Sequence, residues 1–256
     1  MTIEHASVKI ARKPWGRLDL RPWSSIDAST DPVGELWLER ADKSAPNPAL
    51  LLKLLFTSQP LSIQVHPNDE QARARGLEQG KSECWYILDA EPGAVLGLGL
   101  KREVSKDELR AAALNGSIEE LMDCRPVSAG DFVFVPSGTV HAIGAGISLL
   151  EFQQNSDVTY RLYDYGRPRE LHLDDGIAIS NPKPFSGNML QLSGFEERTL
   201  VNGPRFDLKL TSGDALLDRR RWVMPLEGDG VGDCFLIEPG ERVEANVRKL
   251  IGATTS

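Results

Sequence analysis

The segment 61–67 combines metal-binding side chains with the alternation of a β-strand. Successive strand residues point to opposite faces, so Ser62, Gln64 and His66 share one face while the apolar residues between them pack the core. Pro67 then ends the strand, because proline has no amide hydrogen to give to a sheet. The pattern therefore directs an amide and an imidazole toward one polar surface.

Two further positions complete a candidate site for a divalent metal. Alternation places Lys81 beside Glu83 on one face, and a turn at 137–138 leads directly into His141. One amide oxygen, two imidazoles and one carboxylate suit zinc, with Mn, Co or Fe(II) as alternatives. These candidate ligands are Gln64, His66, Glu83 and His141. The competing interpretation is that strand histidines are structural hydrogen-bond partners.

The elements that must position these residues are mostly strands. Apolar runs at 50–56, 84–88 and 131–135 are separated by Gly and Pro turns, which predicts a mainly β fold with a jelly-roll barrel as the best match. A capping box and a closing Asn-Gly predict one helix over 105–116, and a second short helix begins at Ser117.

The chain is expected to divide near 181–184, where Asn-Pro-Lys-Pro resembles a linker. This predicts a metal-binding domain over 1–180 and a smaller C-terminal β domain over 185–256, in which the histidine pattern is not repeated.

Composition narrows the function classes. A net charge of -8 argues against broad binding to nucleic acid or anionic membranes, so an anionic substrate must meet a local basic patch. The chain shows neither a signal peptide nor an apolar run of about 20 residues, which predicts a cytoplasmic protein. The cysteines at 84, 124 and 234 form no CxxC pair and are expected to be reduced. Composition does not decide the oligomeric state.

Several ordered blocks of sequence resemble the type I mannose-6-phosphate isomerases, in their short bacterial form. They include Lys-Pro-Trp-Gly at 13–16, Gly-Glu-Leu-Trp at 34–37, the strand at 61–67 and the segment 80–88. Gly-Thr-Val-His-Ala-Ile at 138–143 and the long stretch 153–167 complete the set. The chain departs from the family at Gly16-Arg17, where a double glycine is commoner, lacks room for the helical insertion of the long forms, and is only loosely similar beyond residue 184.

The resemblance implies a cupin fold and a zinc-assisted isomerase. It implies that mannose 6-phosphate and fructose 6-phosphate are interconverted through a cis-enediol, with one zinc ion per chain. The zinc ligands implied are Gln64, His66, Glu83 and His141. A carboxylate or a zinc-bound water would move the proton, and the metal would stabilise the developing oxyanion.

Further side chains are candidates for binding or proton transfer. By resemblance Arg161 is the first candidate among the residues that do not bind the metal, since a guanidinium forms bidentate hydrogen bonds with phosphate or an enediolate. The alternative is that Arg161 only forms an ion pair at the surface. Lys81 could neutralise the phosphate or donate a proton. Ser62 and Lys53 are further candidates for the phosphate, although Lys53 lies among leucines and could instead pair or snorkel. Glu151 and Asp157 are the candidate bases.

Two other functions compete with an isomerase. A cupin of another class, such as a dioxygenase, would use the same ligands for Fe(II). A catalytically silent protein would bind sugar phosphate without moving a proton.

Overall fold

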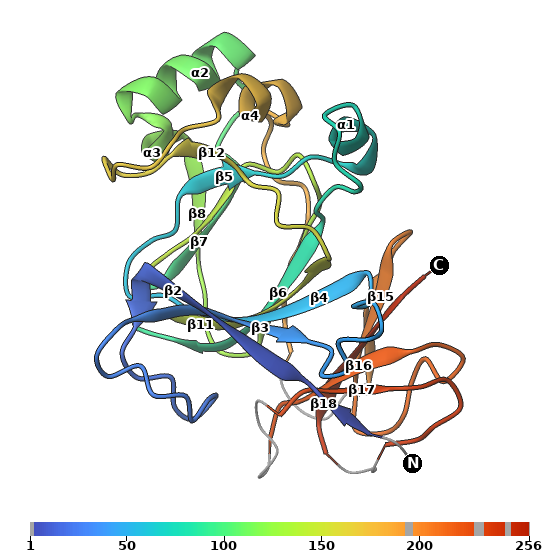
Figure 1. The fold of residues 1–256 in the computed structure, drawn as a ribbon. Coiled ribbons are helices and arrows are strands. Elements are labelled where there is room, and N and C mark those ends of the chain that lie inside the picture. Colours follow the sequence, from blue (N-terminus) through green and yellow to red (C-terminus); the bar gives the residue numbers. More distant parts are fainter. Residues whose placement is uncertain (1–2, 193–196, 228–232, 244–246, 256) are drawn as a thin grey trace. The chain divides into compact units, whose positions relative to one another are not determined.

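The protein, for which we have a computed structural model, is built mainly of β-strands (Figure 1). The structure describes residues 3–192, 197–227, 233–243 and 247–255. Within these residues there are four helices, all of ten residues or fewer. The predicted mainly β class is confirmed, and no helix of the described residues is long and apolar enough to cross a membrane.

Two compact units make up the chain, residues 1–54 with 192–256 and residues 55–191. This division differs from the predicted 1–180 and 185–256. The N-terminal residues group with the C-terminal ones because β1 (Glu4–His5) pairs with β17 (Phe235–Ile237). Such a pairing joins residues more than 200 positions apart and leaves no local signal in the sequence.

The expected linker at 181–184 is instead pinned to the second unit. Asn181 forms a bridge with Thr139, and Pro184 forms one with Gly99. The Val104 amide also donates to the Pro182 carbonyl over 3.0 Å. The segment 181–184, where the sequence predicts a linker, therefore lies within the second unit.

The second unit is a barrel of two antiparallel sheets (Figure 1). One has the strand order β12-β5-β10-β7-β8, and the other includes β13-β9-β6-β11. The bounds of the first sheet are β5 Ile63–Val65, β7 Val95–Leu100, β8 Met122–Pro126, β10 His141–Ile143 and β12 Tyr160–Tyr163. Those of the second are β6 Glu83–Ala90, β9 Asp131–Val135, β11 Ile147–Gln154 and β13 Met189–Gln191.

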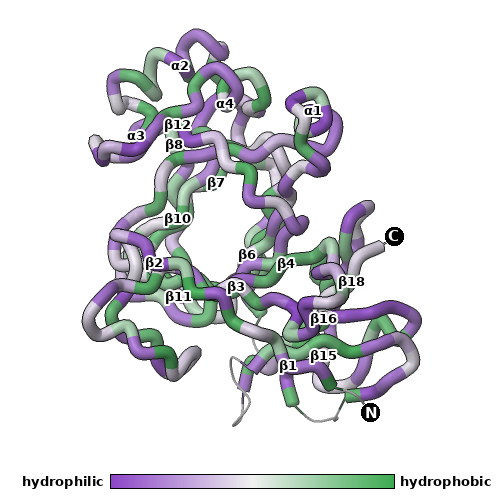
Figure 2. The backbone as a smooth tube through the Cα atoms, viewed as in Figure 1, coloured by the Kyte–Doolittle hydropathy of each residue, from purple (hydrophilic) through white to green (hydrophobic). Residues whose placement is uncertain are grey.

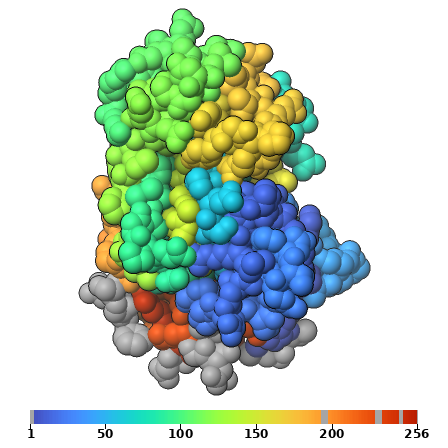
Figure 3. Space-filling view, turned by 90° about the vertical axis from the view of Figure 1, so that its left-hand side faces the viewer, coloured from blue at the N-terminus to red at the C-terminus, as the bar shows by residue number. Residues whose placement is uncertain are grey.

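Three helices cover the outer side of the first sheet. They are α2 Lys106–Asn115, α3 Ile118–Leu121 and α4 Leu173–Ile179, whereas α1 Asp69–Arg73 lies in the connection between β5 and β6. The predicted helix over 105–116 is confirmed, with the Ser105 side chain capping its start and Gly116 at a φ of 85° ending it. Hydrophilic and hydrophobic residues alternate along α2 (Figure 2), and its buried side packs in one cluster with Ile63 and Val65 of β5. In Figure 3, the segment of α2 and α3 in green lies directly against that of β12 and α4 in gold.

The first unit contains a six-stranded sheet of its own. Its sheet has the order β1-β17-β16-β18-β15-β14, with β14 Arg198–Asn202, β15 Phe206–Thr211, β16 Arg221–Pro225 and β18 Lys249–Thr254. Strands β2 Ser7–Arg17 and β3 Val33–Glu39 pair beside β4 Leu50–Phe56, in which every residue is buried as predicted. The chain passes from the first unit to the second within β4.

A tight crossing at Gly80 places the start of β6. The Gly80 amide donates to Asp69 and the Lys81 amide donates to the Pro67 carbonyl, both over 2.9 Å. A Cβ at residue 80 would lie only 2.4 Å from backbone atoms of Pro67 and Asn68. A side chain here would therefore push Lys81 away from the end of β5.

We predict that Gly80→Ala lowers the free energy of unfolding by about 1–3 kcal/mol, because overpacking against backbone cannot relax. Urea unfolding measures this. Gly93→Ala is the control, since a Cβ there meets nothing within 4 Å and only its φ of 85° is strained. Equal losses in the two variants would contradict the close approach as the cause.

Candidate metal centre

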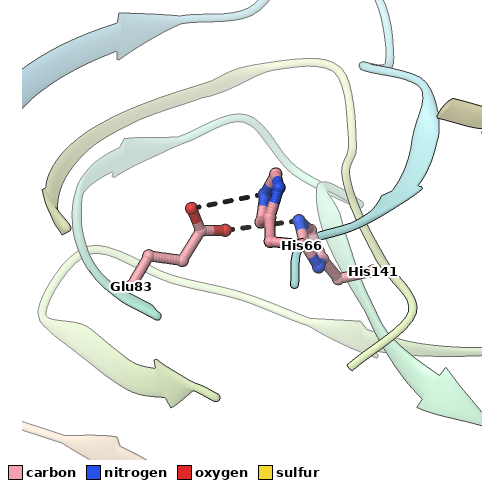
Figure 4. A group of neighbouring side chains, drawn as sticks. All are labelled: His66, Glu83 and His141. Atoms are coloured by element: carbon pink, nitrogen blue, oxygen red, sulfur yellow. Dashed lines mark ion pairs between the residues drawn. The ribbon is translucent and has the colours of Figure 1, made fainter. Parts of the chain in front are cut away.

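His66, Glu83 and His141 converge in the interior of the barrel (Figure 4). Glu83 Oε1 lies 3.2 Å from His141 Nε2, and Glu83 Oε2 lies 3.6 Å from His66 Nε2. Their side chains are 2%, 1% and 1% exposed for His66, Glu83 and His141. One ligand atom from each lies within 4.8 Å of the others, a spacing that a single metal ion can bridge.

Strand ends bring these three residues together. His66 directly follows β5, Glu83 begins β6 and His141 begins β10. The Gly138 amide donates to the His66 carbonyl over 2.8 Å, which ties the turn before β10 to the end of β5. The turn expected at 137–138 therefore places His141 next to β5, the strand that pairs with β10.

Backbone carbonyls orient both imidazoles. His66 Nδ1 lies 2.8 Å from the Val158 carbonyl oxygen, and His141 Nδ1 lies 2.9 Å from that of Thr139. A carbonyl oxygen only accepts, so each Nδ1 carries the hydrogen and each Nε2 keeps its lone pair toward Glu83. This second hydrogen bond is typical of metal-bound histidine.

Burial and neighbouring charges set the protonation states of His66, His141 and Glu83 to those that bind a cation. Burial, reinforced by Lys81, lowers the pKa of His66 to about 3, and burial also lowers the pKa of His141. Burial raises the pKa of Glu83, but Lys81 and His66 lower it by a larger amount, so that the pKa falls well below its usual value. At neutral pH both imidazoles are neutral and the carboxylate is charged.

The donor set fits a divalent cation. Both Glu83 oxygens are buried without a hydrogen-bond partner among the described residues, and Lys81 Nζ lies 2.8 Å from Oε2 as an ion pair. Two imidazole lone pairs and a carboxylate therefore face one another, with a single ammonium beside them at Lys81. Nitrogen and oxygen atoms arranged in this way suit a divalent cation held by all three residues.

Gln64 lies beside this group. It is opposite His141 in the strand register, and its Nε2 is 3.4 Å from His141 Nε2. Its Oε1 accepts a hydrogen bond from the Ser62 hydroxyl over 3.1 Å. Exchanging the amide oxygen and nitrogen would turn a ligand atom toward the group, and the Ser62 hydroxyl can then accept instead.

Lys81 and Glu151 extend the site on one side. Lys81, which is 5% exposed, has its Nζ 3.4 Å from His66 Nε2 and 3.8 Å from Glu151 Oε1. Glu151 is likewise buried and accepts a 3.0 Å hydrogen bond from Trp85, whose ring meets the His141 ring edge-on. A positive and a negative side chain thus stand next to the metal ligands.

Arg161 extends the site along the first sheet. It is opposite Gln64, which is in turn opposite His141, so the three form a row across β12, β5 and β10. Directly opposed residues project from the same face of a sheet. The guanidinium donates to the Glu170 carbonyl over 2.7 Å, and the His172 ring accepts from the Arg161 amide over 3.2 Å.

Two sequence candidates lie elsewhere. Asp157 is exposed and lines a surface hollow with residues 77–79 and 155–158. Lys53 belongs to the first unit, where its Nζ is 3.7 Å from Glu35 Oε2 and 4.1 Å from the centre of the Trp37 ring. Of the outcomes expected for Lys53, the structure shows pairing. His5 is exposed beside Asp233.

Sequence reasoning missed Gln153. This residue is 0% exposed and lies opposite Glu83 in the register of β11 and β6. Its amide donates to the Ser156 carbonyl over 2.6 Å, which fixes the loop whose Val158 carbonyl orients His66. Counting two residues on from Glu151 would have placed Gln153 on the site face.

We predict that His141→Ala weakens zinc binding at least about 100-fold, a larger effect than that of removing an outer-shell partner. Competitive titration against a chromogenic chelator measures the affinity. His5→Ala, at an exposed histidine of the other unit, should bind as the unaltered protein does. Equal affinity of the two variants would show that the metal binds elsewhere.

Comparisons with known proteins agree with this architecture. No model of a protein family matches the chain. A mannose-6-phosphate isomerase of Streptococcus mutans is 42% identical over 189 residues, which make up 68% of this chain and 59% of that protein. The chain spans about three-fifths of the length of the curated relatives it matches.

Solved structures extend the match to the whole fold. The mannose 6-phosphate isomerase of Bacillus subtilis has a TM-score of 0.80 at 26% identity, covering 98% of this chain and 99% of that one. A zinc-bound mannose 6-phosphate isomerase shares the fold with a TM-score of 0.74 at 16% identity, over 100% of each chain. The resemblance found in the sequence blocks is therefore confirmed. In sequence and in fold, the chain is similar to mannose-6-phosphate isomerases.

Proposed function

We propose that the protein interconverts mannose 6-phosphate and fructose 6-phosphate with the help of one zinc ion. The reaction moves a proton between C2 and C1 of the open-chain sugar through a cis-enediol. The observation that carries the proposal is the buried convergence of His66, Glu83 and His141 next to Lys81 and Glu151. The relatives described above support the choice of substrate.

Zinc suits the donor atoms of this site. Two imidazole nitrogens, a carboxylate and an amide oxygen form a four-ligand set, for which we propose His66, His141, Glu83 and Gln64. When bound, zinc supplies positive charge that stabilises the oxyanion of the enediol. The ring hydrogen bonds to Val158 and Thr139 hold the imidazoles in the tautomer that such a metal requires.

Glu151 is our proposed proton carrier. It is a buried carboxylate beside Lys81, whereas Asp157 is exposed at a surface hollow. The Trp85 hydrogen bond occupies Glu151 Oε2 and fixes the plane of the carboxylate, while Oε1 faces the ammonium of Lys81. A fixed carboxylate can take the C2 proton and return it to C1 without a large movement. Lys81 would stabilise negative charge on the substrate oxygens.

Arg161 is our proposed anion-binding residue. It extends the row of His141 and Gln64 and forms no ion pair with a carboxylate within the described part of the chain. A guanidinium offers a planar pair of donors that matches phosphate or an enediolate. Ser62, on the same strand face as Gln64, is a second donor toward the phosphate.

We predict that a chelator abolishes the conversion of mannose 6-phosphate and that added zinc restores it, because the oxyanion loses its stabilising charge without the ion. A coupled assay of fructose 6-phosphate formation measures this. Absence of turnover in fully zinc-loaded protein would overturn the isomerase. Oxygen consumption with Fe(II) would instead identify a dioxygenase, and sugar-phosphate binding without solvent deuterium uptake a silent protein.

We predict that Arg161→Ala lowers kcat/KM for mannose 6-phosphate at least about 100-fold, the size of effect seen when one oxyanion donor is removed. Zinc content should stay at one ion per chain, which separates this role from metal binding. Arg125→Ala is the matched control, because it also removes an arginine of the same unit, one that pairs with Asp123. Unchanged kcat/KM in Arg161→Ala would remove this residue from the reaction.

A further inference from the structure

The loop after β12 contains a buried aspartate that forms ion pairs with two arginines. Asp164 has a side chain 2% exposed. Arg169 donates from Nε to Oδ2 over 2.5 Å and from Nη2 to Oδ1 over 2.6 Å. Arg167 donates to Oδ1 from Nη2 over 2.7 Å and from Nε over 3.2 Å. Four charge-assisted hydrogen bonds therefore bind this one carboxylate, three at Oδ1 and one at Oδ2.

A bulge in β12 puts Asp164 on the side of Arg161. The register shifts between Arg161, opposite Gln64, and Tyr163, opposite Ile63. An extra residue in a strand makes neighbours share a face, and Leu162 and Tyr163 both pack in the cluster that contains Ile63. Arg161 and Asp164, which flank this pair, consequently lie on the opposite side, the one that Gln64 faces.

Arg161 is a cation without a charged partner. No carboxylate of the described residues lies within 4.0 Å of its guanidinium, and its Nε is buried without a hydrogen-bond partner. Burial, together with the positive charges of Arg169 and Arg167, lowers the pKa of Arg161, while Asp164 acts in the opposite sense. Asp164 is thus close enough to influence Arg161, yet it is bound to its two neighbours.

We propose that Arg167 and Arg169 sequester Asp164, so that Arg161 stays free to bind the phosphate of the substrate. The inference rests on the role of Arg161 given under the proposed function. The guanidiniums of Arg161, Arg167 and Arg169 outnumber the two carboxylates that act on Arg161, those of Asp164 and Glu170, in a chain whose net charge is -8. Arg169 then acts as a positioning residue, since it contacts Asp164 and leaves the anion to Arg161.

The reason is competition for one cation. A carboxylate with a free oxygen near Arg161 would form a charge-assisted pair with it, and an incoming phosphate would have to break that pair. The fork of Arg169 occupies both oxygens of Asp164, which prevents this. Arg167 is held against Asp164 by a further hydrogen bond, which it donates to the Pro60 carbonyl over 2.8 Å.

The test measures the binding of inorganic phosphate to the zinc-loaded protein by titration calorimetry. Arg169→Gln should weaken phosphate binding about tenfold, because one competing charge-assisted hydrogen bond is of that size. The double variant Asp164→Asn with Arg169→Gln should recover binding to within about threefold of the original, since the competing charge is gone. Arg75→Gln, which breaks an arginine–aspartate pair with Asp175, is the control and should bind phosphate normally.

A purely structural role predicts the reverse order. If the fork only holds the loop, the double variant should bind phosphate as weakly as Arg169→Gln or more weakly, and that result would overturn the proposal. Unchanged binding by Arg169→Gln, or no phosphate binding by the original protein, would also overturn it. Phosphate binding that follows the predicted order in a protein without isomerase activity would refute the proposed reaction while supporting this inference.

Discussion

The burial of the Glu83 carboxylate is the constraint on which the barrel interior depends. An unpaired carboxylate removed from water costs several kcal/mol, and its histidine neighbours are neutral because burial lowers their pKa. Lys81 provides one countercharge at 2.8 Å. A divalent ion held by Glu83, His66 and His141 would supply the rest. The interior is thus arranged so that the group most costly to bury is also the one that binds the metal.

The fold meets this constraint with backbone groups. Carbonyls of Val158 and Thr139 hold the imidazoles, and the close approach at Gly80 sets the start of the strand that carries Glu83. Each contact comes from a different loop at the barrel end. The metal site and the packing of these loops therefore stabilise one another, and residues that never touch the substrate influence its chemistry.

Local patterns in the sequence predicted the parts that depend on local rules. Alternation in 61–67 placed Gln64 and His66 together, and capping residues defined α2. Long-range pairing escaped prediction: β1 joins β17, and the proline-rich segment at 181–184 belongs to the barrel. The bulge in β12 also has no sequence signature, so the position of Asp164 beside Arg161 became visible only in the structure.

Thermal unfolding with and without zinc tests the central claim, that the buried negative charge of Glu83 binds a metal cation. A metal that binds only the folded state raises Tm with its concentration. We expect zinc to raise the Tm of the metal-free protein progressively and to raise the Tm of Glu83→Gln much less at the same zinc concentration, because the variant keeps the neutral ligands and loses the only negative charge among them. Equal zinc-dependent rises in both proteins, or no rise in the original, would contradict it.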